Sequence, residues 1–178
     1  MFIALATMAN GQAEDFKGWH DLDEATVEQH VDVETCKVYV VAKSKVQMKN
    51  KKKVAKQQAA IDAVGTTVVS ELQRAFPKAT FQLVADAKEA PADALLIEAC
   101  LDEIDWGNAV LRQTVGMGAG AISGTYSAKV SNAKGLVMTF KNSRVHANPF
   151  ASAKGAPVIN TYNEALAKDL IEALKAIR

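Results

Sequence analysis

Residues 107–120 carry the most distinctive pattern for chemistry in this 178-residue sequence, a run of glycines at Gly107, Gly116, Gly118 and Gly120. A glycine-rich turn binds phosphate when it joins a strand to the N-terminus of a helix. Here the next regular element is predicted to be a strand, and no ribose-binding acid follows about twenty residues later. We therefore interpret the glycines as a structural loop or bulge where the backbone comes close to a neighbour, and we predict no cofactor.

Asn108 and Arg112 place two polar side chains in the same segment. An arginine guanidinium pairs with a carboxylate or a phosphate through parallel N–H donors, so Arg112 is the side chain here best suited to bind an anion. We predict that the loop from Asn108 to Gly120 is a contact surface. An alternative is a pocket beneath this loop, lined by Trp106 and Met117, that binds a small ligand.

A second cluster is basic, because seven lysines and no acidic residue fall between positions 43 and 56. They are Lys43, Lys45, Lys49, Lys51, Lys52, Lys53 and Lys56. We predict that Lys49, Lys51, Lys52 and Lys53 form a patch that binds anionic lipid head groups, lipopolysaccharide phosphates or an acidic partner. A solvated loop and helix face is the alternative. No aromatic residue lies among the lysines, so stacking with nucleic-acid bases is disfavoured.

The titratable residues form no catalytic or metal-binding pattern. The three histidines stand apart in the sequence, at His20, His30 and His146. The acidic stretch at residues 20–24 lacks the spacing of a metal-binding loop. No serine or cysteine lies in a nucleophile motif, so we predict no catalytic residue and no metal site. A hydrolase would instead need a histidine that the fold brings to Ser123, Ser127 or Cys100.

The two cysteines, Cys36 and Cys100, leave a disulfide bond open as a possibility. Cys36 lies just before one predicted strand, whereas Cys100 lies in the middle of another. In a parallel pairing the two positions are out of register by several residues, and a disulfide needs Cα atoms within about 7 Å of each other. We therefore favour two small buried thiols over a bridge.

Hydrophobic periodicity predicts the elements that position these groups. Strands are expected at residues 37–42, 81–84, 94–106, 125–130 and 136–140, the last two forming a hairpin. A change of phase at Glu103-Ile104 predicts a bulge or bend there. Apolar residues at helical spacing predict a long helix over 51–75, which Pro77 ends. After a long loop over 142–159, a capping box at Thr161–Glu164 predicts the start of a C-terminal helix.

This order of elements predicts an α+β two-layer sandwich, with one mostly antiparallel sheet and both helices packed on one face. We expect a single domain over residues 37–178, after an acidic lead-in at 14–36. Residues 1–13 are uncharged, mostly apolar and end with small residues, which predicts a signal peptide truncated at its start. No other stretch reaches the roughly 20 apolar residues of a membrane span. We therefore expect an exported protein, without a lipid anchor at Cys36.

The charges of the sequence nearly cancel, with 21 basic and 20 acidic residues and a formal net charge of +1. Such a balance excludes a general binder of nucleic acid or of membrane surfaces. The cancellation takes place between the acidic lead-in and the lysine cluster. We predict that the lead-in covers the lysines until a partner displaces it.

The combination of Gly107-Asn108, Arg112 and the run from Val115 to Gly120, between a long strand and a hairpin, resembles the bacterial family catalogued as domain of unknown function 4410. The resemblance implies an exported envelope protein, since many members are lipoproteins. The order of elements is similar to the N-terminal domain of the Tol translocation protein and to curli-secretion and penicillin-binding-protein-activator lipoproteins, which contact other envelope proteins. The family resemblance implies no catalytic residue for this chain.

The function predicted from these observations is a non-enzymatic interaction module of the periplasm or cell surface. Its partner is expected to be another envelope protein or an anionic surface component. The alternative is a periplasmic protein that binds a small ligand in a pocket at the glycine-rich loop.

Overall fold

The computed structural model describes residues 24–46, 54–107, 122–146 and 156–178. In chain order the elements are β1 (Glu24–Val27), η2 (Val33–Thr35), β2 (Lys37–Ser44), α2 (Val54–Asp62), α3 (Val64–Ala75), β3 (Thr80–Leu83), η4 (Ala87–Glu89), β4 (Leu95–Asp105), β5 (Ile122–Asn132), β6 (Gly135–His146) and α5 (Ala156–Ala176). The two η elements are single turns of 3-10 helix.

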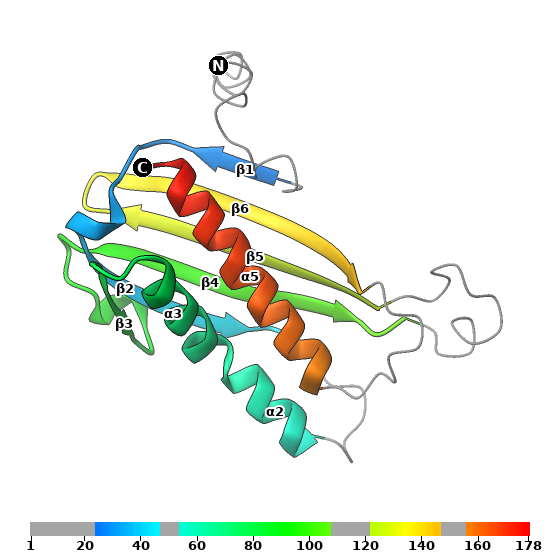
Figure 1. The fold of residues 1–178 in the computed structure, drawn as a ribbon. Helices are drawn as coiled ribbons and strands as arrows, with labels where there is room; N and C mark the ends of the chain where they lie inside the picture. The colour runs from blue at the N-terminus through cyan, green and yellow to red at the C-terminus, as the bar shows by residue number, and fades with distance from the viewer. Residues whose placement is uncertain (1–23, 47–53, 108–121, 147–155) are drawn as a thin grey trace.

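The strands form one six-stranded sheet in the order β1-β6-β5-β4-β2-β3, as Figure 1 shows. Among the first four strands of this order, each pair of neighbours is antiparallel, whereas β2 is parallel to both of its neighbours, β4 and β3. The expected mostly antiparallel sheet is therefore confirmed. The bulge expected at Glu103-Ile104 is present slightly earlier, since the register of β4 against β5 shifts between Leu101 and Glu103.

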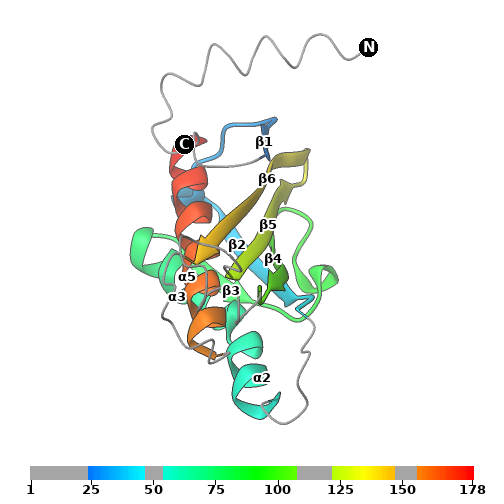
Figure 2. The ribbon, with the colours of Figure 1, turned by 90° about the vertical axis from the view of Figure 1, so that its right-hand side faces the viewer.

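The helices α2, α3 and α5 lie on one face of the sheet, which Figure 2 shows from the side. Alternate residues of each strand point to this helical layer because side chains alternate along a strand. Ile97 and Leu101 of β4 and Val130 of β5 are buried there against Leu166 and Leu170 of the α5 layer. The predicted two-layer α+β sandwich is confirmed. None of the described helices is long and apolar enough to span a membrane.

The helix expected over residues 51–75 is divided, in its described part, into α2 and α3. The division falls at Ala63, whose φ of −75° is helical but whose ψ of −5° lies outside the range of an α-helix. Two residues later a Cβ at Gly65 would lie 2.8 Å from Leu83 Cδ1, so a larger residue at this position requires the Leu83 side chain to shift. The helix ends just before Pro77, as the sequence predicted.

The C-terminal helix begins earlier than the sequence suggested. The capping box predicted at Thr161–Glu164 is wrong, because α5 runs without a break from Ala156 and this segment lies inside it. Pro157 occupies the first turn, where the missing backbone N–H has no partner to lose. Val158 and Ile159 are buried, so the apolar stripe of α5 extends to this first turn.

β5 and β6 form the predicted hairpin and are longer than expected, since β6 continues to His146. The long loop expected over 142–159 is thus shortened at both ends by regular structure. In the turn, the Lys134 N–H donates to Asn132 Oδ1 at 2.8 Å. Gly135 has a φ of +117°, a conformation that glycine adopts without strain.

Part of the acidic lead-in belongs to the folded sheet, although the domain was expected to begin at residue 37. β1 pairs with β6 along all four of its residues. The turn η2 buries Val33 and is capped by Asp32, which accepts a hydrogen bond from the Glu34 N–H at 3.1 Å. A strand of four residues is too short to show a clear alternation in the sequence, which is why pattern analysis missed β1.

Both cysteines carry free thiols. In the parallel ladder of β2 and β4, Lys43 lies opposite Cys100, so Cys36 is seven positions away from that point along the chain. At about 3.3 Å per residue this separation exceeds 20 Å, far beyond the reach of a disulfide. Cys36 and Cys100 are thus too far apart to form a bridge, as the strand register predicted, but both thiols are partly exposed rather than buried.

Candidate interaction surface

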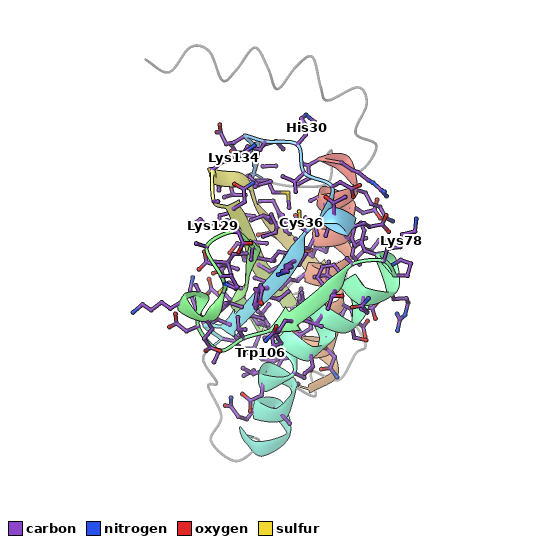
Figure 3. All side chains as sticks on the ribbon, turned by 90° about the vertical axis from the view of Figure 1, so that its left-hand side faces the viewer. His30, Cys36, Lys78, Trp106, Lys129 and Lys134 are labelled. Carbon is purple, nitrogen blue, oxygen red and sulfur yellow. The ribbon has the colours of Figure 1, made fainter. Side chains whose placement is uncertain are left out.

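The face of the sheet opposite the helices, here named the outer face, is polar across β4, β5, β6 and β1. Strand alternation sends every residue that lies between two core residues to this side. The outer face comprises Glu98, Cys100 and Asp102 of β4, Ser127 and Lys129 of β5, Thr139 and Lys141 of β6, and Glu24 and Thr26 of β1. Figure 3 shows Lys129 on the side of the sheet away from the helices.

The strand register arranges these residues in rows across the sheet. One row consists of Cys100, Ser127, Lys141 and Glu24. The next row consists of Glu98, Lys129, Thr139 and Thr26. Residues directly opposite one another have Cβ atoms about 4.5–5.5 Å apart, so each row places acids beside bases or hydroxyl groups. Lys129 Nζ, for example, lies 3.5 Å from the Glu98 carboxylate.

A groove of about 520 Å³ runs across the outer face from β4 to β1. Its charged residues are of both signs, Glu24 and Glu98 on one hand and Lys129 and Lys141 on the other. The hydrogen-bonded sheet sets their backbone positions, so the order of the charges across the outer face is fixed. Such a pattern selects a partner whose charges complement it.

Asp102 connects the outer face to the lysine cluster. Its Oδ1 accepts a hydrogen bond from Lys45 Nζ at 2.7 Å, and its Oδ2 accepts one from Ser127 Oγ at 2.6 Å. Partial burial acts to raise the pKa of the Asp102 carboxyl, but the hydrogen bonds from Lys45, Ser127 and Cys100 and the positive charge of Lys45 together hold that pKa below its usual value. The bond to Asp102 also raises the pKa of Lys45. The pair is thus charged at neutral pH.

The nucleophilic groups near Asp102 are not activated. Burial, followed by the negative charge of Asp102, raises the pKa of the Cys100 thiol to about 11. The thiolate is the reactive form, so Cys100 is protonated and a poor nucleophile at neutral pH. Ser127 donates to a carboxylate of lowered pKa, which is a weak general base.

Histidine is the usual general base of a hydrolase, and His30 is the one histidine whose side chain lies within the described residues. His30 Nδ1 lies 3.2 Å from the backbone oxygen of Ile177, at the end of α5. His20 and the side chain of His146 lie outside the described part of the structure. Across the described residues, no group of three or more His, Cys, Asp or Glu side chains is placed to hold a metal ion.

Most of the residues predicted as binding residues lie outside the described ranges. They are Asn108, Arg112, Gly116, Gly118 and Gly120 of the glycine-rich loop, and Lys49, Lys51, Lys52 and Lys53 of the lysine patch. Gly107 is described and has a φ of +58°, which favours glycine, and its N–H donates to Asp105 Oδ1 at 2.9 Å. Trp106, labelled in Figure 3, is half-buried and packs against the hydrophobic core.

Two acidic residues of the lead-in contact the C-terminal residue rather than the lysines. Arg178 Nη2 lies 2.8 Å from Glu34 Oε2, and Arg178 Nε lies 3.3 Å from Asp32 Oδ1. Both acids precede β2, whereas the lysine cluster begins at the other end of this strand, roughly 25 Å away at 3.3 Å per residue. Asp32 and Glu34 therefore do not cover the lysines as the lead-in was predicted to do.

A buried polar cluster between α5 and the sheet was missed by sequence analysis. Tyr126 Oη donates to Asp169 Oδ2 at 2.5 Å, and Asn142 Nδ2 donates to the same oxygen at 2.7 Å. Arg144 donates from Nε to Tyr126 Oη at 2.7 Å and from Nη2 to Asp169 Oδ1 at 2.5 Å. The signal in the sequence is that Asn142 and Arg144 occupy positions of β6 that point to the helical layer. The cluster attaches α5 to β5 and β6.

Comparisons with known proteins agree with the fold and with the family resemblance. A family model described as a domain of unknown function (DUF4410) matches residues 21–147. No curated protein matches the sequence. The structure of a PelC dodecamer from Paraburkholderia phytofirmans has a TM-score of 0.53 at 9% identity and covers 84% of this chain and 97% of its own. A single-substitution variant of that protein gives 0.51 at 12% identity, covering 84% and 95%. At these identities the likeness shows the fold alone.

Proposed function

This protein belongs to the family described as domain of unknown function DUF4410, and from this premise we propose that it is a non-catalytic interaction module of the bacterial cell envelope. It is exported to the periplasm or the cell surface. There it binds another envelope protein through its outer face, where acidic and basic side chains lie side by side on neighbouring strands.

The chemistry of the outer face supports a protein partner rather than a substrate. Its ion pairs join Lys45 to Asp102 and Lys129 to Glu98, and both pairs are partly exposed. Exposed charges at an interface increase the rate of encounter and select among partners more than they add affinity. The raised pKa of the Cys100 thiol and the weak basicity of Asp102 do not support nucleophilic catalysis.

The lining of the groove also supports this reading. Small-molecule sites are lined mostly by apolar and aromatic side chains with a few polar groups. Here Ala25, Ala128 and Phe140 point to the helical layer, and the side chains that face the groove are charged, hydroxylated or the thiol of Cys100. A protein surface that carries complementary charges matches this composition better than a small apolar ligand does. The alternative of a ligand pocket at the glycine-rich loop rests on residues outside the described ranges.

Export is supported by the sequence at residues 1–13, where an apolar run is followed by small residues.

The lysine patch at Lys49, Lys51, Lys52 and Lys53 is a second candidate contact, with anionic lipid or lipopolysaccharide head groups as its ligands. A role in assembly is also supported by the two PelC chains that share this fold, because both are described as dodecamers.

Site-specific photo-crosslinking in living cells tests the outer face. A photoreactive amino acid is placed at Ser127 or at Thr139 on the outer face, and at Ser70 or Lys168 on exposed positions of α3 and α5 as matched controls. We expect the two outer-face positions to give an adduct with one and the same envelope protein, identified by mass spectrometry. The helical positions should not give this adduct.

Charge reversal separates a true contact from chance proximity. Lys129→Glu with Lys141→Glu should lower the yield of the adduct, while Lys134→Glu in the β5–β6 turn should leave it unchanged. Equal adducts from the outer face and from the helices, or a yield unaffected by reversal, would show that the outer face is not the binding surface. Reversal of Lys49, Lys51, Lys52 and Lys53 tests the lysine patch in the same assay.

A further inference from the structure

The six-stranded sheet ends in two short edge strands, β1 and β3. Each has four residues, and within the described chain β1 pairs only with β6 and β3 only with β2. Figure 1 shows the two strands on opposite sides of the sheet. A strand that pairs on one side presents a row of backbone N–H and C=O groups on the other, and another strand can pair with them.

The residues with outward backbone groups follow from the hydrogen bonds of each ladder. The Val84 N–H donates to Val40 O at 2.9 Å, so alternate residues of β3 face β2 and the backbone groups of Phe81 and Leu83 point to the open edge. The same reasoning applies to β1 at the opposite edge. There the Glu28 N–H donates to the β6 backbone at 2.8 Å, so the backbone groups of Ala25 and Val27 point outward.

An exposed apolar side chain lies at the β3 edge. Leu83 is 43% exposed, and the described part of the chain has one other large hydrophobic residue that is exposed, Val145. β3 contains no charged residue and no proline, which natural proteins commonly place on edge strands to prevent pairing. A groove of about 490 Å³ next to Leu83 is lined on α3 by residues that include Val69 and Thr66.

We propose that β3 of one copy of this protein pairs with β1 of a second copy, head to tail. The strand directions in the sheet make β1 antiparallel to β3, so the two edges meet as an antiparallel pair. In the register that uses the outward backbone groups, Ala25 of one copy lies opposite Leu83 of the next, and Val27 lies opposite Phe81. All four residues then exchange backbone hydrogen bonds across the interface.

The side chains match in this register. Val27 of β1 and Phe81 of β3 both pack against the hydrophobic core, so Ala25, two residues before Val27, and Leu83, two after Phe81, share their faces. Apolar residues therefore meet on the helical side of the joined sheet. On the outer face Thr26 of one copy lies opposite Gln82 of the next, and both are polar. An offset of one residue would place apolar residues opposite polar ones.

The interface joins two different edges, so it is heterologous. In a pair of copies, the copy that contributes β3 keeps β1 free, and the copy that contributes β1 keeps β3 free. Such contacts build a closed ring when the rotation between copies closes, and an open chain when it does not. The outer faces of successive copies would then form one continuous surface. This inference extends the proposed function, but it uses the sheet edges rather than the outer face, so each can fail independently.

Sedimentation velocity over a range of protein concentrations tests the edge pairing. We expect the unsubstituted protein to form oligomers that Leu83→Lys abolishes, because a lysine ammonium at the edge opposes burial. Val145→Lys changes the other exposed apolar residue and should leave the oligomers unchanged. Circular dichroism checks that both variants are folded. A monomeric unsubstituted protein, or oligomers that persist in Leu83→Lys, would overturn the proposal.

Disulfide trapping tests the register independently of the Leu83 variant. Thr26 and Gln82 form a non-hydrogen-bonded pair in the proposed interface, with Cα atoms about 4.5 Å apart, which suits a disulfide. Mixing a Thr26→Cys variant with a Gln82→Cys variant should give a covalent dimer under mild oxidation. In one chain the two positions are five strand spacings of about 4.8 Å apart, so any such bond joins two copies.

The matched control for trapping combines Thr26→Cys with Leu83→Cys, whose side chains lie on opposite faces of the joined sheet. We expect no heterodimer above the level of the unsubstituted protein, which carries the two native thiols. Equal trapping in the control and the test pair would overturn the register. Outer-face charge reversal that removes the envelope adduct while the oligomers remain would separate this interface from the proposed function.

Discussion

Tyr126 of β5 donates its hydroxyl hydrogen to Asp169 of α5 across 2.5 Å, in the layer between the sheet and the helix. The two residues are 43 positions apart in the sequence, so the bond fixes the helix on a distant strand. Asn142 and Arg144 also donate to the same carboxylate. Inside a protein such a network stabilises the fold only while every member has its partner.

Asp169→Asn should lower the free energy of unfolding by about 2 kcal/mol, less than the roughly 3–5 kcal/mol of a fully buried broken pair, because Arg144 is partly exposed. The substitution removes the charge that faces the Arg144 guanidinium and retains the size of the side chain. Urea unfolding followed by circular dichroism measures the change. Glu172→Gln on the same helix breaks an exposed ion pair with Lys175 and should cost less than about 0.5 kcal/mol. Equal losses in the two variants would contradict the role of Asp169.

Tyr126→Phe should cost about 1–2 kcal/mol of unfolding free energy, because Asp169 loses a donor and Arg144 loses an acceptor. Burial, and then the hydrogen bond to Asp169, raises the pKa of the Tyr126 hydroxyl, so it remains a donor at neutral pH. Combined with Asp169→Asn, the loss should be smaller than the sum of the two single losses. Strict additivity would mean that the two residues act separately.

The sequence predicted the elements whose signals are local and repeated. The alternation along β4 and β5, the glycine of the β5–β6 turn and Pro77 after α3 each determine their structure through nearby residues, and all three are present. β1 was missed because its four residues gain stability by pairing with β6, more than 100 positions later. The start of α5 was misplaced because Thr161 has a capping sequence, while packing of Val158 and Ile159 adds a further turn.

The candidate site was harder to predict than the fold. The outer face arises from strand register, which sets Lys141 between Ser127 and Glu24, and no sequence pattern shows which strands are neighbours. The hydrogen bonds of Asp102 to Lys45 and Ser127 likewise depend on which strands are neighbours in the sheet. The outer face and the hydrogen bonds of Asp102 could not be predicted because both depend on which distant strands pair with each other.

Gly124→Ala should lower the free energy of unfolding by about 2 kcal/mol through overpacking. A Cβ at this position would lie 2.5 Å from the ring of Tyr162. That ring is buried, and its hydroxyl oxygen lies 3.2 Å from both Ile122 O and Arg144 O, which share its single O–H donor, so the ring has little room to move. Thermal and urea unfolding measure the loss. The adjacent Ser123→Ala, on the outer face, should change stability by less than about 0.5 kcal/mol.

A second variant tests the cause of that loss. In a Tyr162→Leu background the aromatic ring is absent, so adding Gly124→Ala should cost less than it does in the unsubstituted protein. If the cost is the same with and without the ring, the effect belongs to the backbone of β5 rather than to the contact with Tyr162.

The reactivity of Cys100 should depend on pH through Asp102. In a Cys36→Ser variant, the rate of alkylation by iodoacetamide should rise with a midpoint near pH 11, because burial and the Asp102 charge raise the pKa of the thiol from its ordinary 9.0. Asp102→Asn should move the midpoint to lower pH, since it removes the negative charge while the Lys45 ammonium remains nearby. Ser123→Ala should leave the midpoint unchanged.

The same shift predicts how stability varies with pH. The pKa of Cys100 is higher in the folded than in the unfolded chain, so the protonated thiol contributes stability below about pH 9, and this contribution is lost as the pH rises toward 11. Cys100→Ala should therefore flatten the decline in unfolding free energy over that interval. A midpoint of alkylation near 9, or one that rises in Asp102→Asn, would show that Asp102 does not control the thiol.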